Sequence, residues 1–148
     1  MIKSTFQQEV MEILGISDDE ISPIPLELER QFYASAFGLY ESGDYRGAAL
    51  LFTQLVLTDP YSEHYWRGLA SSKQMAKEYQ AALHAWSMVA LLKEKDPLPH
   101  FHAAECCLSL DDKEDALKAL DAAFDLSDSD ESMREKINLL KTIHYAKF

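Results

Sequence analysis

The sequence repeats itself with a period of 34 residues, and this period constrains the fold more than any other feature of the chain. An alanine marks the same position in each copy: Ala48, Ala82 and Ala116. Four residues later, each copy has a large apolar side chain: Phe52, Trp86 and Leu120. Two antiparallel helices approach closely only where one offers a small side chain, and a bulky residue one turn later fills the space beside that contact. The spacing therefore predicts helical hairpins that stack in register.

Further positions keep the same period. Sixteen residues before each alanine stands a ring: Phe32, Trp66 and His100. Asp59-Pro60 ends the first copy, since proline cannot continue a helix. The alanine, aromatic and proline positions match the tetratricopeptide repeat, which they indicate in three tandem copies over residues 28–128. We therefore predict an all-α fold in which three tandem tetratricopeptide-repeat hairpins form a short superhelix.

Flanking helices are expected at both ends, because terminal repeats must cover an apolar face. Residues 1–27 predict an N-terminal helix and linker, and residues 129–148 predict a C-terminal capping helix, so that residues 1–148 form a single domain. Ser132 and Glu135 have the spacing of a capping box at the start of the C-terminal helix. The apolar face of that helix is expected to comprise Met133, Ile137, Leu140, Ile143 and Phe148.

One junction between copies is irregular. Asp96-Pro97 lies 37 residues after Asp59-Pro60, whereas the alanines keep their spacing of 34. We expect a long second helix in copy two and a late start for the helix that follows.

The N-terminal segment has an apolar stripe at helical spacing before Gly15. Its members are Phe6, Val10, Ile13 and Leu14. A helix of two to three turns is marginal without a partner surface. Two alternatives stay open: the stripe packs on its own domain, or it forms a homodimer contact with a second copy.

In the tetratricopeptide repeat, the first helix of each hairpin lines the concave face, so its positions i, i+4 and i+7 are expected to face one groove. Copy one contributes aromatic side chains: Tyr33, Phe37 and Tyr40. Copies two and three contribute a mixed set: Arg67, Ser71, Gln74, Met75, Phe101, Glu105 and Leu108. Apolar side chains on an open wall are typical of an interaction site, so we expect a polypeptide partner. The alternative is that Tyr33 and Phe101 belong to the core.

Composition and spacing exclude several other functions. The net charge of −11 at pH 7 disfavours partners such as nucleic acid and anionic membranes. A phosphate-binding loop, a nucleophile elbow and histidines at metal-ligand spacing are not found, so we predict no enzyme, no cofactor and no metal site. The adjacent Cys106 and Cys107 are predicted to be buried thiols in a reducing compartment. No segment has the pattern of a signal peptide or a membrane span, so we expect a cytoplasmic protein.

The chain resembles the class II chaperones of bacterial type III secretion. The resemblance is carried by residues 39–45, by Thr58-Asp59-Pro60 followed by residues 64–69, and by residues 96–106. The most family-specific stretch is Phe101-His102-Ala103-Ala104-Glu105-Cys106, which a generic repeat does not require.

The resemblance implies a cytosolic chaperone that holds hydrophobic secretion substrates, typically pore-forming translocators, until export. It implies that an extended segment near the substrate's N-terminus lies in the concave groove, and that the N-terminal helix mediates homodimers. A gatekeeper or another effector is an alternative cargo. A scaffold or regulatory adaptor that links components of a protein assembly is the alternative function. The resemblance assigns client contacts to Tyr33, Phe37, Tyr40, Phe101 and Leu108.

Overall fold

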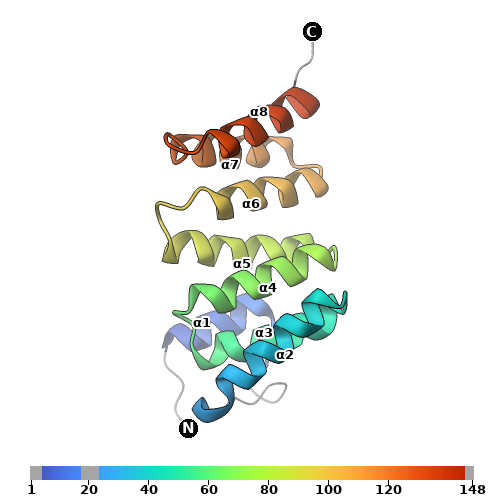
Figure 1. The fold of residues 1–148 in the computed structure, drawn as a ribbon, viewed down its shortest axis with the longest axis vertical. Coiled ribbons are helices and arrows are strands. Elements are labelled where there is room, and N and C mark those ends of the chain that lie inside the picture. The colour runs from blue at the N-terminus through green and yellow to red at the C-terminus, as the bar shows by residue number, and fades with distance from the viewer. Residues whose placement is uncertain (1–4, 18–23, 146–148) are drawn as a thin grey trace.

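The computed structural model describes residues 5–17 and 24–145, with side chains described from residue 8 onward. These residues form helices that stack as successive layers, from α2 and α3 at one end to α8 at the other (Figure 1). A short 3₁₀ turn at Leu26–Leu28 precedes α2. The helices are α1 (Thr5–Leu14), α2 (Glu29–Glu41), α3 (Tyr45–Thr58), α4 (Glu63–Met75), α5 (Tyr79–Leu92), α6 (Leu98–Ser109), α7 (Lys113–Asp125) and α8 (Glu131–Tyr145).

Three hairpins, α2 with α3, α4 with α5 and α6 with α7, form the body of the fold, and each packs against the next. The periodic alanines Ala48, Ala82 and Ala116 are completely buried. A second set of alanines with the same period is also completely buried, and it lies on the first helix of each hairpin: Ala36, Ala70 and Ala104. Small side chains on both helices therefore allow the close approach within each hairpin. The prediction of stacked helical hairpins is confirmed.

The turns inside the three hairpins have the same backbone geometry. The residue at the tip of each turn has a positive φ: 90° at Gly43, 65° at Lys77 and 60° at Asp111. The next residue donates its N–H to the carbonyl five positions earlier, at 2.9 Å in all three turns. This closure satisfies a carbonyl at the helix end. Only glycine adopts a left-handed conformation without steric cost, so Lys77 and Asp111 are held in it by the fold.

The junction between the second and third hairpins corrects one expectation. The predicted long second helix of copy two is wrong, because α5 and α3 both have 14 residues. The extra length lies in the connection over residues 93–97, where the Asp96 side chain accepts the N–H of Leu98 at 2.9 Å and also binds Arg67. The helix after this connection does start late, at Leu98.

The N-terminal helix α1 packs against α3 and α5, the second helices of the first two hairpins. It ends before Gly15, as predicted, and Val10 and Met11 are buried in the main core. The following segment is fastened by the Ile24 N–H, which donates to Thr58 Oγ1 at 3.0 Å. This bond places residue 24 beside the C-terminal end of α3 in space. Residues 24–28 then lead from that point to the start of α2.

The C-terminal helix α8 covers the last hairpin, as expected of a cap. Met133 and Ile137 share a second core cluster with Phe101 and Leu120. The predicted cap at Ser132 is wrong: α8 begins at Glu131, and Asp130 Oδ1 accepts the Met133 N–H at 3.0 Å. An aspartate placed three residues before Met133 takes the role that was assigned to the serine.

The predicted apolar face of α8 is only partly buried. Leu140 is half-buried, and Ile143 is 59% exposed. Phe148 lies outside the described residues.

The hairpin turns generate a prediction on stability. Lys77→Gly should raise the free energy of unfolding by about 0.5–1 kcal/mol, because glycine removes the steric cost of the positive φ. The matched control is Lys93→Gly, at an exposed loop position with a φ of −131°. That control should lower stability, because glycine there only loosens the unfolded chain. Urea unfolding followed by circular dichroism measures both, and a loss of stability in Lys77→Gly would contradict the account of the turn.

Candidate functional site

A cavity of about 280 Å³ opens between α2 and α4 on the face formed by the first helices of the hairpins. Three of its lining residues come from α2, one from α3 and four from α4. The lining is Tyr33, Phe37, Tyr40, Phe52, His64, Arg67, Gly68 and Ser71. The structure thus brings together the three predicted aromatic residues of copy one with Arg67 and Ser71 of copy two.

The aromatic side chains that line the cavity differ in how much of their surface is exposed to solvent. The ring centroid of Tyr33 lies 6.0 Å from that of Phe37, 6.0 Å from that of Phe52 and 5.6 Å from that of Tyr65. Phe37 is 47% exposed, whereas Phe52 is buried beneath the cavity. Tyr40 is half-buried, and its ring centroid lies 5.4 Å from that of Tyr45. Phe37 therefore offers the most accessible apolar surface, over a floor that the other rings hold in place.

The floor of the cavity depends on a close approach between α4 and α3. A Cβ atom added to Gly68 would collide with the ring of Phe52. Only a residue without a side chain lets α4 lie directly on that ring. Gly68 is thus a packing residue of the groove, which the repeat pattern did not single out.

A second hollow, of about 580 Å³, continues the groove toward the 3₁₀ turn and shares Tyr33 and His64 with the first. Its other lining residues are Leu26, Glu29, Arg30, Ser62 and Tyr65. The Tyr65 hydroxyl donates to Glu29 Oε1 at 2.9 Å. Burial and the neighbouring Glu29 raise the pKa of Tyr65 to about 12. The sequence prediction missed this extension, although Glu29 lies one helical turn before Tyr33 on the same face of α2.

The middle of the groove is closed by a network of polar side chains. Trp86 Nε1 donates to Gln74 Oε1 at 2.8 Å, and Gln74 Nε2 donates to Glu105 Oε1 at 3.2 Å. His102 Nδ1 lies 2.6 Å from the same carboxylate oxygen, and the His102 ring stacks on Trp86 with centroids 4.6 Å apart. The predicted groove residues Gln74 and Glu105 therefore bind each other and join α4, α5 and α6.

Arg67 is also engaged within the protein. Its guanidinium donates hydrogen bonds to Glu63, one turn earlier on α4, and to Asp96 in the connection before α6. The groove wall between the second and third hairpins is thus held by an ion pair at one edge and by the Gln74–Glu105 bond at the other.

The remaining predicted groove residues are less uniform. Met75 is 48% exposed, and Leu108 is half-buried. Phe101 corrects the expectation: its side chain is only 8% exposed, because the third hairpin and α8 enclose it in the second core cluster. The core alternative therefore describes Phe101 better than a place on the groove wall.

The four proposed dimer residues of α1 are separated by the structure. Val10 is 1% exposed and belongs to the main core, while Leu14 is half-buried against the same core. Ile13 is 46% exposed. The side chain of Phe6 lies outside the described residues. Two of the three described residues of the predicted stripe thus pack against the core of their own chain. Among these three, Ile13 is the one whose side chain is exposed.

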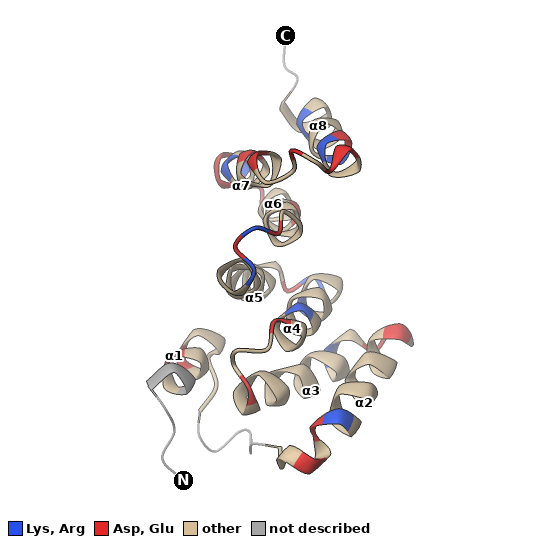
Figure 2. Cartoon of the chain, turned by 60° about the vertical axis from the view of Figure 1, so that its left-hand side comes forward, with Lys and Arg blue, Asp and Glu red and all other residues tan. Residues whose placement is uncertain are grey.

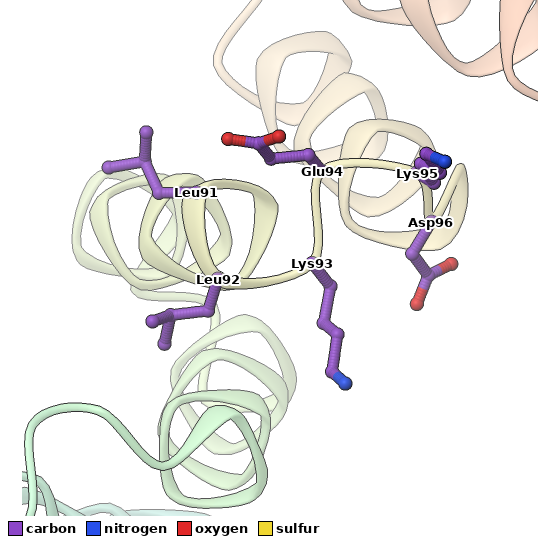
Figure 3. A pocket seen from close by; sticks show the side chains of 6 residues that line it. All are labelled: Leu91, Leu92, Lys93, Glu94, Lys95 and Asp96. Atoms are coloured by element: carbon purple, nitrogen blue, oxygen red, sulfur yellow. The ribbon is translucent and has the colours of Figure 1, made fainter.

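The connection between α5 and α6 contains basic and acidic residues (Figure 2) and lies beside a hollow of about 610 Å³. Its lining side chains point in different directions: Leu91 and Leu92 diverge, and Lys93 points away from Glu94 (Figure 3). A binding site needs polar groups that converge on one point. This hollow therefore offers no organised site for a ligand.

Three further properties bear on what the described residues can do. Over residues 5–17 and 24–145, no group of three or more histidine, cysteine or acidic side chains is arranged to hold a metal ion. In the same residues, no helix has the length and apolar character needed to cross a bilayer. Cys106 and Cys107 are buried and unpaired, and burial raises the pKa of Cys106 to about 12. The thiol of Cys106 therefore remains protonated, as expected of a packing residue.

No model of a known protein family matches the chain, but individual proteins are similar to it in sequence. It is 36% identical over 108 residues to the low calcium response locus protein H of Yersinia pestis, a match that covers 73% of the chain and 62% of that relative. The chain thus spans less than two thirds of the length of this curated relative.

Solved structures are similar over nearly their full length. The Yersinia enterocolitica type III secretion chaperone SycD, in complex with a peptide of the translocator YopD, is 32% identical with a TM-score of 0.69, over 81% of the chain and 99% of SycD. SycD has also been solved as an alternative dimer. PcrH of Pseudomonas aeruginosa, in complex with the chaperone-binding region of PopB, is 29% identical with a TM-score of 0.70, over 78% of the chain and 96% of PcrH.

The floor of the cavity generates one prediction. Gly68→Ala should lower the free energy of unfolding by about 1–3 kcal/mol, because the added methyl group displaces the Phe52 ring in a filled core. Gly38→Ala is the matched control, since a Cβ at that helical position meets nothing within 4 Å. The control should be neutral or stabilising by up to about 1 kcal/mol. Equal urea midpoints for the two variants would contradict the close approach of α4 to α3.

The polar network generates a prediction on pH dependence. Burial opposes ionisation of Glu105, but the His102 hydrogen bond and charge, the Gln74 amide and Lys136 outweigh it and hold the pKa of Glu105 below its usual value of 4.5. Such a carboxylate stabilises the fold above pH 4.5, and this contribution disappears as the pH falls through the lowered pKa.

Glu105→Gln should therefore flatten the loss of stability of the wild type below pH 4.5. Urea unfolding between about pH 2 and about pH 7, which brackets the usual carboxyl pKa range of about 3.9–4.3, provides the measurement. Glu41→Gln, at the exposed end of α2, is the control and should keep the acid dependence of the wild type. If Glu105→Gln shows the same acid dependence as the wild type, the network does not stabilise the ionised carboxylate.

Proposed function

The chain belongs to the class II chaperones of bacterial type III secretion, and from this premise we propose that it binds an extended segment of a hydrophobic secreted substrate in its groove. The observation that carries the proposal is the open cavity beside Phe37, whose lining comes from three helices. This family is one of chaperones and not of enzymes. We place the chaperone in the bacterial cytoplasm, where it keeps its client from aggregation and premature contacts before export.

The size of the cavity supports a peptide side chain as its ligand. Pockets for drug-sized molecules and cofactors typically span about 300–1,000 Å³ and enclose most of the ligand. The cavity measures about 280 Å³ and opens into a neighbouring hollow. Burying one large apolar side chain contributes about 1.5–3 kcal/mol, so a few such anchors are needed to offset the ordering of an extended segment.

The clients of two relatives support the substrate class. SycD binds a peptide of the translocator YopD, and PcrH binds the chaperone-binding region of PopB. We therefore propose translocators of the chain's own secretion system as its clients, with a gatekeeper or effector as the alternative cargo.

We also propose that the repeats and both flanking helices, residues 1–148, act as a single domain. A homodimer contact through α1 is part of this proposal, with the exposed Ile13 as its described contact residue. The dimeric arrangement of SycD supports it.

A scaffold or regulatory adaptor is the second candidate function. The observation in its favour is that Leu50 on α3 and Leu91 on α5 are 65% and 68% exposed, both on second helices of the hairpins and outside the cavity. A scaffold would use such outer residues to hold folded components, whereas a chaperone depends on the groove. The two functions therefore assign binding to different apolar residues.

The test compares one groove residue with one outer residue. The affinity-tagged chain is co-expressed with each translocator of its own secretion system, and the copurified translocator is quantified. Phe37→Asp should reduce the complex by about tenfold or more, because it places a charge in the apolar cavity. Leu50→Asp should leave it unchanged, and both variants should keep the urea midpoint of the wild type. Retention of the translocator by Phe37→Asp together with its loss in Leu50→Asp would favour the scaffold.

A further inference from the structure

The C-terminal helix α8 occupies the position of a first helix in a fourth repeat. Its first residue, Glu131, follows Glu63, the first residue of α4, by 68 positions, which is twice the period of 34. Leu139 therefore has the register of Phe37, Ser71 and Glu105, all three of which the sequence places in the groove.

The face of α8 that a further helix would cover is polar. Its residue in the register of the buried alanines Ala36, Ala70 and Ala104 is Asn138, which is exposed. Arg134 has the register of the buried Trp66, and its guanidinium lies 4.1 Å from the centre of the Phe124 ring. A polar outer face is what a terminal helix of a repeat array requires.

The apolar residues of α8 that remain exposed lie in a different register. Leu139 and Ile143 are 60% and 59% exposed, and they are one helical turn apart. Ile143 has the register of Met75, which is 48% exposed on α4. These two residues thus continue the register of the groove and not that of the capping face.

The buried side chains of α8 share one core cluster with Phe101 of α6, which supports this placement of α8. Lys136, one turn before Leu139, acts on Glu105 of α6 and favours its ionised form. Glu105 is one turn from Leu108, which is half-buried on α6. The inner sides of α6 and α8 therefore face a common region, where Leu108 and Leu139 provide apolar surface beyond the polar middle of the groove.

The polar side chains in the middle of the groove also constrain the charge of a client segment that crosses them. Glu63 and Asp96 share one cation, Arg67, and Glu105 binds His102 and Gln74. Three carboxylates thus face two permanent cations, Arg67 and Lys136, on this part of the wall. A neutral or basic segment is compatible with the middle of the groove, whereas an acidic segment is repelled.

We propose that α8 forms the far wall of the groove and that Leu139, Ile143 and Leu108 hold a second apolar side chain of the same client segment. The inference rests on the proposed chaperone function, and continuity of the groove register selects the client as the occupant. Three successive spacings between first helices, each at least about 8 Å as for directly packed helices, separate the two anchors, so an extended chain that rises about 3.3 Å per residue needs at least about seven residues between them. The client segment has an apolar residue at each end and a neutral or basic stretch between them.

Photo-crosslinking tests this arrangement in the full chain. A photoreactive phenylalanine analogue replaces Phe37, Leu139 or Asn138, and each variant is co-expressed with the translocators of the same secretion system. Asn138 is the matched control, because it neighbours Leu139 but lies on the capping face. Mass spectrometry identifies the crosslinked residues. We expect positions 37 and 139 to crosslink to one translocator segment, at sites at least about seven residues apart, and position 138 to give no such product.

The outcomes separate this inference from the proposed function. Crosslinks from position 37 alone, or from position 139 to a second copy of the chain, would overturn the role of α8 and leave the chaperone function standing. Absence of any translocator from the purified complex and of any crosslink at position 37 would overturn the chaperone function itself.

Titration with the crosslinked translocator segment as a labelled peptide provides the second measurement. Leu139→Asp should weaken binding by about tenfold, and Asn138→Asp should have no effect. Equal affinities for the two variants would overturn the inference, and the urea midpoints show that both remain folded.

Discussion

The close contact between small side chains at intervals of 34 residues is the constraint on which the rest of the structure depends. Two sets of completely buried alanines, one on each helix of the hairpins, bring the paired helices together. Each second helix then packs against the first helix of the next hairpin. The inner positions of α2 and α4 thereby line one cavity, and the Gln74–Glu105 bond joins α4 to α6. Gly68 extends the same principle to the contact between hairpins, where α4 lies directly on Phe52. The groove is thus a consequence of how closely the backbones pack.

Packing also determines which part of the groove is apolar and which part is polar. Phe37 packs beside the ring of Tyr33, which itself contacts the rings of Phe52 and Tyr65, and the apolar surface of Phe37 stays exposed. In the middle, Gln74, Glu105 and His102 satisfy one another and hold the hairpins in register. A site that is ordered before it meets its ligand loses less entropy on binding. The groove therefore combines an ordered apolar cavity, which the proposed function uses as an anchor site, with a polar section that is already satisfied.

The sequence was sufficient for features that depend on periodicity, because register determines which residues meet. It predicted the hairpins, the end of α1 before Gly15 and the gathering of Tyr33, Phe37 and Tyr40 around one cavity. It failed where a single contact decides the outcome. The length of α5 was overestimated because Asp96 binds Arg67 and caps α6 in a longer connection, and Phe101 is buried because α8 packs over it.

The central claim is that the groove between the first helices receives the client. Hydrogen–deuterium exchange of the chain, alone and in complex with a translocator of its own secretion system, tests this claim most directly. The account predicts slower exchange in α2, α4 and α8 on binding, with little change in the outer helices α3 and α5. Protection confined to α3 and α5, with α2 and α4 unchanged, would contradict it.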